Sequence, residues 1–352
     1  MVERDELADW LRLLETPGVG LEAARAHLAQ AGSLEAAVAG LPAPPPELPA
    51  LVERTWAWLQ ADPQHDVLTL ADPDYPPLLM QTADPPLLLY LVGRRELLGR
   101  EALAVVGSRK PTPQGHDNAY DFSRELAASG LVIVSGLALG VDGAAHEGAL
   151  KAAGDTIAFV GTGLDQIYPR RHNSLGERIQ QEGLMISEYA LGTPPLPPHF
   201  PRRNRLIAGL ARGCLVVEAA LKSGSLITAR LASEAGREVF AIPGSIHSPQ
   251  SRGCHALIRQ GAKLVESAAD VLEELPLKHG VSAGAAAAPE DLGSPQLKRL
   301  LGLMGYEPVT LEELLNRGAG TSAEVSAWLL DLELAGQVAR LAGQLFQRRV
   351  RT

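Results

Sequence analysis

Glycine, serine and basic residues follow several short apolar runs in this sequence, a combination that suits phosphate groups. The run LAVV is followed directly by Gly107, Ser108 and Arg109. Glycine lets a ligand approach the backbone, free N–H groups bind phosphate oxygens, and arginine can bind them with two parallel hydrogen bonds. A tight turn whose arginine only caps a neighbouring group is the alternative. We favour anion binding because three further segments point the same way.

A second segment of this kind precedes a helical pattern. Lys222, Ser223, Gly224 and Ser225 follow the apolar run at 214–219. The first N–H groups of a helix lack partners within it and carry positive partial charge. The segment therefore offers N–H groups, hydroxyls and an ammonium group to an anion.

Arginines are concentrated between residues 168 and 213. This window holds seven Arg against three Glu, a surplus of +4 in a chain whose formal net charge is −9. Five of them are candidate phosphate ligands: Arg170, Arg171, Arg202, Arg203 and Arg205. Such a run is often only a solvated face. Small residues nearby favour a packed helix instead, and we expect these five arginines to line one groove that runs past Arg109.

The segment VSGLALGVDGAAHEGAL contains a possible acid and base. Asp142 and His146 stand four residues apart, but the spacing places no nucleophile beside them. We favour Asp142 as a helix cap with His146 hydrogen-bonded to it. The G-x-G-x-x-G fingerprint, Walker A, H-E-x-x-H and G-x-S-x-G are absent. We therefore expect many phosphate contacts, with no catalytic residue, cofactor or metal.

Alternating strands and helices must position these segments. The β-branched runs are LAVVG (103–107), LVIVSG (131–136), TIAFVG (156–161), LMISE (184–188), CLVVEA (214–219), EVFAIPG (238–244) and AKLVES (262–267). Strands separated by helical patterns over ~20–30 residues predict parallel βαβ units of the α/β class, with helices on both faces. In such sheets, ligands bind beyond the carboxyl ends of the strands.

Composition divides the chain into four parts. We expect a helical domain at 1–62, the α/β domain at 63–277, a Gly/Ala-rich linker at 278–296 and a helical domain with two strands at 297–352. In the first part, LLETPGVGLEAARAHL matches a helix-hairpin-helix pattern. Its Gly-Val-Gly turn could present N–H groups to a DNA phosphate, or the hairpin could serve only for packing.

The last part has the pattern of a winged helix. We expect its second helix at Thr310–Asn316, its third at Ser322–Leu334, and the wing at Gln337–Leu341 and Gln344–Arg349. The third helix carries three acidic residues and neither Lys nor Arg, which is poor chemistry for a major groove. Only the tail, with Arg348, Arg349 and Arg351, is basic, so protein interaction or packing is at least as well supported as base reading.

Composition also excludes several classes of protein. A chain with 46% apolar and 21% charged residues is not wholly disordered. Two cysteines cannot build a disulfide framework or a zinc site of four cysteines. The N-terminus lacks signal-peptide features, and no apolar run reaches the ~18 residues that span a bilayer. We expect a soluble, reduced cytoplasmic protein without membrane contact, whose nucleic-acid affinity would need a local basic patch.

Eight segments, from about residue 74 to 267, resemble the DNA-processing protein A family, also called DprA or Smf. They are AVVGSRKPTPQG, SGLALGVDGAAHEGAL, TIAFVGTGLDQIYPRRHN, LMISEYALG, FPRRNRLIAGL, VVEAALKSGSLITARLA, REVFAIPG and GCHALIRQGAKL. The resemblance implies an extended Rossmann-like domain that binds single-stranded DNA and forms a homodimer. It also implies a non-enzymatic protein that loads RecA recombinase in natural transformation or repair, with single-strand-binding protein as a further partner. The family's DNA-contacting arginine falls on Arg109, and a basic residue after Tyr-Pro falls on Arg170 or Arg171.

Two rival functions remain open on the same fold. The fold also resembles lysine-decarboxylase-like nucleotide phosphoribohydrolases, which cleave the glycosidic bond of a nucleotide. Their P-G-G-x-G-T loop is not found here, and Pro243, Gly244 and Ser245 are the nearest approach to it. A nucleotide sensor is the third possibility, because a mononucleotide could use the same N–H groups as a strand phosphate.

Overall fold

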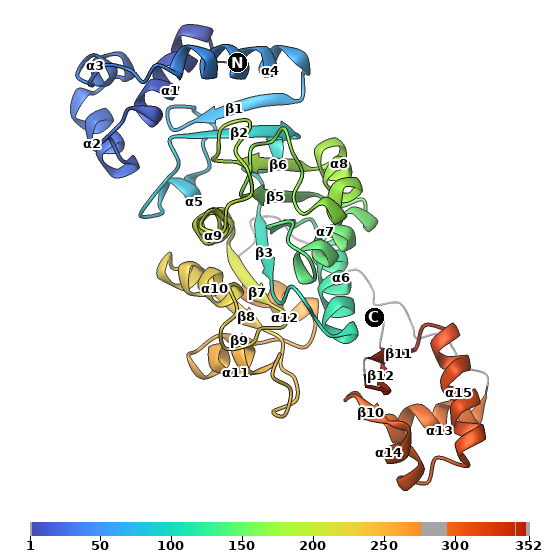
Figure 1. Cartoon of the computed structure of the whole chain (residues 1–352). Helices are drawn as coiled ribbons and strands as arrows, with labels where there is room; N and C mark the ends of the chain where they lie inside the picture. Colours follow the sequence, from blue (N-terminus) through green and yellow to red (C-terminus); the bar gives the residue numbers. More distant parts are fainter. Residues whose placement is uncertain (1, 276–293, 342, 350–352) are drawn as a thin grey trace.

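A nine-stranded sheet forms the centre of the molecule (Figure 1). The computed structural model describes residues 2–275, 294–341 and 343–349, so most of the predicted linker and Arg351 lie outside the described residues. In sheet order the strands are β1 (His65–Thr69), β2 (Leu88–Gly93), β6 (Leu184–Ser187), β5 (Thr156–Val160), β4 (Val132–Ser135), β3 (Ala102–Val106), β7 (Gly213–Val216), β8 (Glu238–Ala241) and β9 (Lys263–Leu264). Neighbours from β6 to β9 are parallel, whereas β1 and β2 are antiparallel additions.

The seven predicted strands correspond to β3–β9, which confirms the doubly wound, mostly parallel α/β class. The pair β1–β2 was not anticipated. The residues of β2 are almost all buried, and its apolar run does not alternate, so periodicity alone does not separate it from a buried helix.

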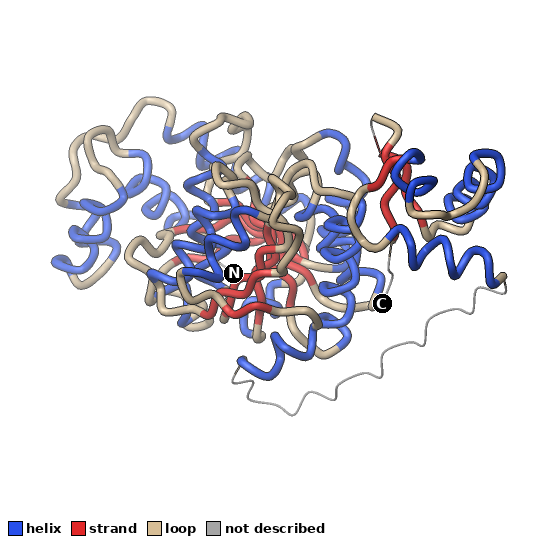
Figure 2. The backbone as a smooth tube through the Cα atoms, turned by 90° about the horizontal axis from the view of Figure 1, so that it is seen from below, coloured by secondary structure: helices blue, strands red, loops and turns tan. Residues whose placement is uncertain are grey.

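Helices cover both faces of the sheet (Figures 1 and 2). On one face lie α6 (Pro113–Ala128), α7 (Val141–Lys151) and α12 (Ala268–Glu274); on the other lie α5 (Pro77–Met80), α9 (His199–Leu210), α10 (Ser225–Glu234) and α11 (Arg252–Arg259). Each face of the sheet has its own apolar core, and strand β3 contributes to both. Its Leu103 and Val105 lie in the core beneath α6, α7 and α12, whereas Ala104 and Val106 lie in the core beneath α5, α9, α10 and α11. Successive side chains of a strand alternate between faces, so both cores are built from one sequence run.

The N-terminal helices share a core with the β1–β2 end of the sheet. They are α1 (Arg4–Glu15), α2 (Leu21–Ala31), α3 (Leu34–Ala39) and α4 (Leu48–Ala61). Leu7 and Trp10 are fully buried in the same cluster as Val67 and Tyr90, which face them from β1 and β2. Helix α8 (Asn173–Glu182) contributes Ile179 to this cluster, while the 3₁₀ turns η1 (Arg95–Gly99) and η2 (Arg170–His172) connect neighbouring elements.

The C-terminal residues form the predicted winged helix. Its elements are α13 (Pro295–Met304), β10 (Val309–Thr310), α14 (Leu311–Asn316), α15 (Ser322–Leu334), β11 (Val338–Leu341) and β12 (Leu345–Arg348). The third helix has the predicted bounds, and a short strand, β10, completes the sheet in the order β10-β12-β11. A separate apolar cluster holds this domain together (Figure 1). Among the helices of the described residues, none is long and apolar enough to cross a membrane.

Candidate functional site

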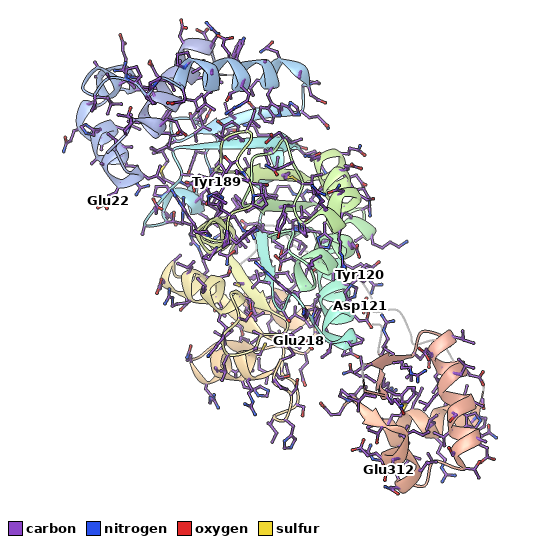
Figure 3. The ribbon with its side chains drawn as sticks, in the orientation of Figure 1. Glu22, Tyr120, Asp121, Tyr189, Glu218 and Glu312 are labelled. Atoms are coloured by element: carbon purple, nitrogen blue, oxygen red, sulfur yellow. The ribbon has the colours of Figure 1, made fainter. Side chains whose placement is uncertain are left out.

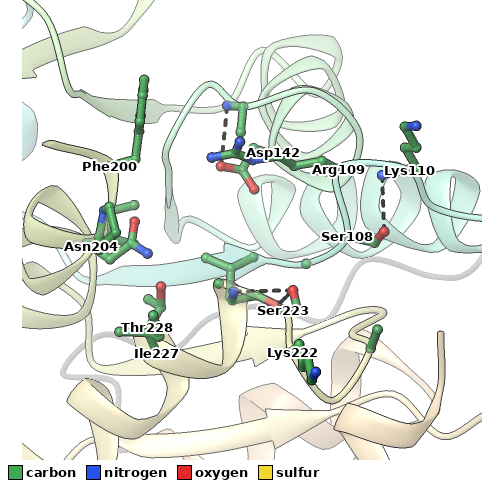
Figure 4. A pocket seen from close by; sticks show the side chains of 18 of the residues that line it. Ser108, Arg109, Lys110, Asp142, Phe200, Asn204, Lys222, Ser223, Ile227 and Thr228 are labelled. Atoms are coloured by element: carbon green, nitrogen blue, oxygen red, sulfur yellow. Dashed lines mark hydrogen bonds between the residues drawn. The ribbon is translucent and has the colours of Figure 1, made fainter. Parts of the chain in front are cut away.

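A cavity of about 540 Å³ opens beyond the carboxyl ends of β3 and β7, between α9 and α10 (Figure 4). The chain segments that meet there include the loop after β3, the turn after β4, the start of α9 and the segment before α10. Eight of the predicted site residues line it: Gly107, Ser108, Arg109, Arg203, Lys222, Ser223, Gly224 and Ser225. Parallel strands place their carboxyl ends at one edge, which explains how residues more than a hundred positions apart converge.

The loop after β3 is packed tightly behind its exposed arginine. A Cβ on Gly107 would lie 2.7 Å from a methyl carbon of Val141, so only glycine fits there. The N–H of Val141 donates to the carbonyl of Ser108 at 3.1 Å, and the N–H of Lys110 donates to the Ser108 hydroxyl at 3.1 Å. Arg109 and Lys110 remain exposed, with the Arg109 guanidinium 5.6 Å from the ring centroid of Phe200.

The segment before α10 supplies the opposite wall. The hydroxyls of Ser223 and Ser225 are 2.7 Å apart, and the N–H of Ser225 donates to the Ser223 hydroxyl at 3.3 Å. Lys222 is exposed beside them (Figure 4). The wall therefore presents ordered hydroxyls and an ammonium group at the positive end of a helix, as the sequence predicts.

Arg203 lines the cavity but is almost wholly buried. Its exposed fraction is 3%, and its guanidinium donates to the carbonyl of Phe159. The Arg203 Nε has no hydrogen-bond partner among the described residues. Burial lowers the pKa of Arg203 to about 10, so the side chain stays charged at neutral pH. Arg203 therefore adds positive charge beside the cavity with very little exposed surface of its own.

Asp142 is buried beside Arg203 and lines the same cavity. It accepts the N–H groups of Gly136 at 3.1 Å and Ala138 at 3.4 Å. Burial raises the pKa of Asp142, while Arg203 and the two N–H groups oppose that rise. Asp142 thus orders the turn after β4, and the N-cap of α7 is Gly140, not Asp142 as expected.

The expected bond between Asp142 and His146 is wrong. The imidazole Nδ1 of His146 is 2.7 Å from the Thr156 hydroxyl, and its Nε2 accepts the N–H of Leu137 at 3.3 Å. The Thr156 hydroxyl donates to the carbonyl of Ile133, so its oxygen accepts a hydrogen bond from the Nδ1–H of His146. One neutral tautomer satisfies both ring nitrogens, and burial lowers the pKa of His146 to about 3.

The single arginine groove expected from the sequence is wrong for Arg202 and Arg205. Arg205 forms ion pairs with Glu188 and Asp84, and Arg202 lines a second cavity of about 920 Å³ on whose wall those two acids also lie. Consecutive residues of a helix are rotated by about 100°, so three arginines within four positions cannot share one face.

Arg170 and Arg171 are exposed in η2, which follows Tyr168 in the sequence, and the ring of Tyr168 contacts that of Phe200 in the wall of the first cavity. The ring centroids of Tyr168 and Phe200 are 5.6 Å apart, and Tyr168 is 43% exposed. The peptide bond between Tyr168 and Pro169 is cis. A path of cationic and aromatic groups therefore leads from Arg109 over Phe200 and Tyr168 to η2.

Sequence reasoning missed Phe200, which forms part of the cavity wall between Arg109 and Tyr168. The available signal was an aromatic residue directly before the basic segment PRRNR. Aromatic rings beside cations provide stacking surfaces for planar groups such as nucleobases.

The Gly-Val-Gly turn of the N-terminal hairpin faces the second cavity. Val19 and Gly20 line it together with Glu15, Glu22, Asp84 and Glu188. Tyr189 and Glu22, which also line this cavity, come from different parts of the chain (Figure 3). Because these four acids outnumber the two arginines of the cavity, Arg25 and Arg202, the environment opposes a phosphate and favours the packing interpretation of the hairpin. Within the described part of the chain, no group of three or more His, Cys, Asp or Glu residues could hold a metal ion.

Fold and site together define an extended Rossmann-like protein with a cavity lined by several basic side chains at the carboxyl edge of its sheet, and with a winged-helix domain. Residues 66–276 match the family model of DNA recombination-mediator protein A, and residues 283–344 match the DprA winged helix domain. The chain therefore belongs to the DNA recombination-mediator protein A family, whose members are called DprA or Smf.

Individual relatives agree with this assignment. Protein Smf of Escherichia coli is 43% identical over 300 residues, covering 83% of this chain and 79% of the relative. The DNA processing protein DprA of Streptococcus pneumoniae is 50% identical over 206 residues, 58% of this chain and 73% of the relative. The solved structure of the S. pneumoniae protein aligns with a TM-score of 0.66 at 38% identity, over 78% of this chain and 99% of that one.

A second similar structure is that of DNA processing protein A from Helicobacter pylori, which was solved to show how that protein binds single-stranded DNA. It aligns with a TM-score of 0.54 at 36% identity, over 60% of this chain and 97% of that one.

Proposed function

We propose that this protein binds single-stranded DNA along the first cavity and loads RecA recombinase onto that DNA during natural transformation or recombinational repair. The observation that carries the DNA-binding part is the convergence of Arg109, Lys222 and Phe200 on one cavity at the carboxyl edge of the sheet. The H. pylori relative, described by its single-stranded DNA binding mode, supports the same ligand class.

Each group in the cavity has a distinct role in this proposal. Arg109 and Lys222 bind backbone phosphates, and the serine hydroxyls before α10 accept or donate beside them. Phe200 and the exposed Tyr168 stack bases, which requires unpaired and unstacked strands and therefore favours single-stranded DNA over duplex. Arg170 and Arg171 hold the next phosphates outside the cavity. None of these groups reads a base edge, so we expect weak sequence preference.

The charge distribution supports a protein partner for the DNA-bound form. The window 168–213 has a surplus of +4 while the whole chain has −9, so the surface elsewhere is net acidic. A molecule with one basic and one acidic side can hold DNA and a second protein together. A homodimer, implied by the family resemblance, would present two strands and two such acidic surfaces.

DNA binding is tested by fluorescence anisotropy with a labelled oligothymidylate and its duplex at several salt concentrations. We expect tighter binding of the single strand and affinity that falls steeply with salt. Equal affinity for both DNA forms would contradict the proposal. A parallel incubation with AMP tests the rival enzyme, since released adenine would identify phosphoribohydrolase activity.

RecA loading is tested by the DNA-dependent ATP hydrolysis of RecA on strands coated with single-strand-binding protein. Substoichiometric amounts of the wild-type protein should shorten the lag before hydrolysis. The Arg109→Ala variant should leave the lag as long as it is without added protein. If the wild-type protein does not change the lag, the RecA-loading part of the proposal is wrong and only the single-strand-binding part stands.

A further inference from the structure

Glu218 follows β7 and lies next to the loop that carries Arg109. Strands β3 and β7 are paired in parallel, and the N–H of Val217 donates to the carbonyl of Val106 at 3.1 Å. The backbone of Glu218 therefore runs alongside Gly107, where a Cβ would lie 3.0 Å from the Glu218 carbonyl oxygen. An acidic residue at this position is unexpected, because a carboxylate near the cavity repels phosphate.

The carboxylate of Glu218 binds the far end of the same loop. Its two oxygens accept the N–H of Thr112 at 2.9 Å and the hydroxyl of Thr112 at 2.6 Å. The Thr112 hydroxyl in turn accepts the N–H of Gly115 at 3.0 Å and thereby caps α6. Both carboxylate oxygens are thus used within the protein, and burial raises the pKa of Glu218 while these bonds lower it.

Glycine at position 115 is required by this arrangement. A Cβ there would lie 2.3 Å from the carboxyl carbon of Glu218. The carboxylate therefore occupies the space that a side chain on the first turn of α6 would otherwise fill. A buried carboxylate is not needed to cap α6, because the Thr112 hydroxyl alone accepts the N–H of Gly115.

The loop from Gly107 to Thr112 is consequently held at both ends. Its start is fixed by the pairing of β3 with β7, and its end by the two hydrogen bonds that Thr112 donates to Glu218. Arg109 stands between these two anchors, aimed at Phe200. A long side chain binds a phosphate well only if its backbone is prearranged, because ordering it on binding costs entropy.

We propose that Glu218 is a positioning residue, which sets the backbone of the Arg109 loop through Thr112 and so determines the affinity for single-stranded DNA. This inference rests on the proposed function. It assigns Glu218 no contact with DNA, and it predicts that the effect of Glu218 on binding requires Arg109.

A double-mutant cycle tests this dependence. Oligothymidylate affinity is measured by anisotropy for the full-length wild type, Glu218→Ala, Arg109→Ala and the double variant. Glu218→Ala should weaken binding roughly tenfold in the wild type and less than about twofold when Arg109 is already alanine, because only coupled residues deviate from additivity. Thr112→Ala should reproduce Glu218→Ala, and Glu218→Gln should keep affinity within about threefold because it retains an acceptor for the Thr112 N–H.

Glu101→Ala is the matched control. Glu101 also accepts two hydrogen bonds, from Arg212, but it lies just before β3 at the opposite edge of the sheet. Its removal should lower the free energy of unfolding without changing DNA affinity.

Two outcomes would overturn the positioning role while DNA binding stands. In the first, Glu218→Ala weakens binding equally with and without Arg109. In the second, Glu218→Ala has no effect on binding although Arg109→Ala does. If Arg109→Ala itself has no effect, both the positioning role and the proposed phosphate contact are wrong. Should Glu218→Ala fail to fold, Thr112→Ala and Glu218→Gln complete the cycle with Arg109→Ala, and a Thr112→Ala effect that is independent of Arg109 overturns the inference.

Discussion

Arg349, just after β12, binds Asp117 on α6 with both arms of its guanidinium. The Nε of Arg349 is 2.5 Å from one carboxylate oxygen, and an Nη donates to the other. Burial would raise the pKa of Asp117, but His116 and Arg349 hold it below its usual range. Arg349 of the basic tail is thus bound to the α/β domain rather than free for DNA.

The first prediction is that this ion pair docks the winged-helix domain. Arg349→Gln should release the winged-helix domain from the α/β domain. Without the Arg349 guanidinium, the charged carboxylate of Asp117 is more stable when hydrated than when buried at the contact between the domains. Small-angle scattering should show a larger radius of gyration, and raised salt should have the same effect on the wild type. Arg348→Gln is the control, since Arg348 packs on Tyr306 within the winged-helix domain, 4.9 Å from its ring centroid. An unchanged radius for Arg349→Gln would show that other contacts dock the domain.

The second prediction separates an exposed arginine of the first cavity from an arginine that is held in ion pairs. Arg109→Ala should weaken single-strand binding by about 1–3 kcal/mol with little effect on folding, as for a charge-assisted hydrogen bond. Arg205→Ala should do the reverse, lowering the free energy of unfolding by roughly 3–5 kcal/mol, because it leaves Glu188 (7% exposed) without its closest partner. Anisotropy and chemical denaturation measure the two effects. A lower stability with unchanged affinity for Arg109→Ala would make Arg109 structural.

The third prediction concerns the exposed arginines of η2. Charge reversal of Arg170 and Arg171 together should flatten the salt dependence of single-strand binding, with the log–log slope falling by about 0.7 for each phosphate that the variant no longer neutralises. Arg178→Glu is the control, because Arg178 on α8 is already paired with Glu182. A wild-type slope in the double variant would place both arginines outside the DNA path.

The fourth prediction concerns the winged-helix domain. Deletion of residues 290–352 should leave most single-strand affinity intact, because the exposed residues of α15 include Glu324, Asp331 and Glu333 and no cation. Circular dichroism and sedimentation would establish that the truncated protein stays folded. Loss of binding by a folded truncation would make the winged helix a principal DNA site.

The fifth prediction is a pH dependence of stability caused by His146. Its pKa is lowered from 6.5 in the unfolded chain to about 3 by burial, so the folded state favours the neutral ring. The unfolded state binds the additional proton as pH falls below about 6.5, and stability should then decrease by up to ~1.4 kcal/mol per pH unit. His146→Gln should flatten the profile between pH 6 and 4 in urea titrations. The exposed His27→Gln serves as control, and an equally steep profile in His146→Gln would assign the effect to other groups.

Much of this protein could be predicted from local sequence. The strands β3–β9, the bounds of α15 and the glycine- and serine-bearing strand ends all follow from short-range periodicity and turn chemistry. Because parallel strands must end at one edge, the sequence alone is enough to expect that Gly107–Arg109 and Lys222–Ser225 converge.

Tertiary structure alone decided which charged side chains face the cavity. The letters of RRNR do not show that Arg203 is buried, that Arg205 pairs with Glu188, or that Arg202 lines another cavity. Likewise, Thr112 and Glu218 are 106 positions apart, and Asp117 and Arg349 are 232 apart. Such contacts depend on the rotation of each helix and on the pairing order of distant strands. Both are set by the packing of the whole core, which no short segment of sequence contains.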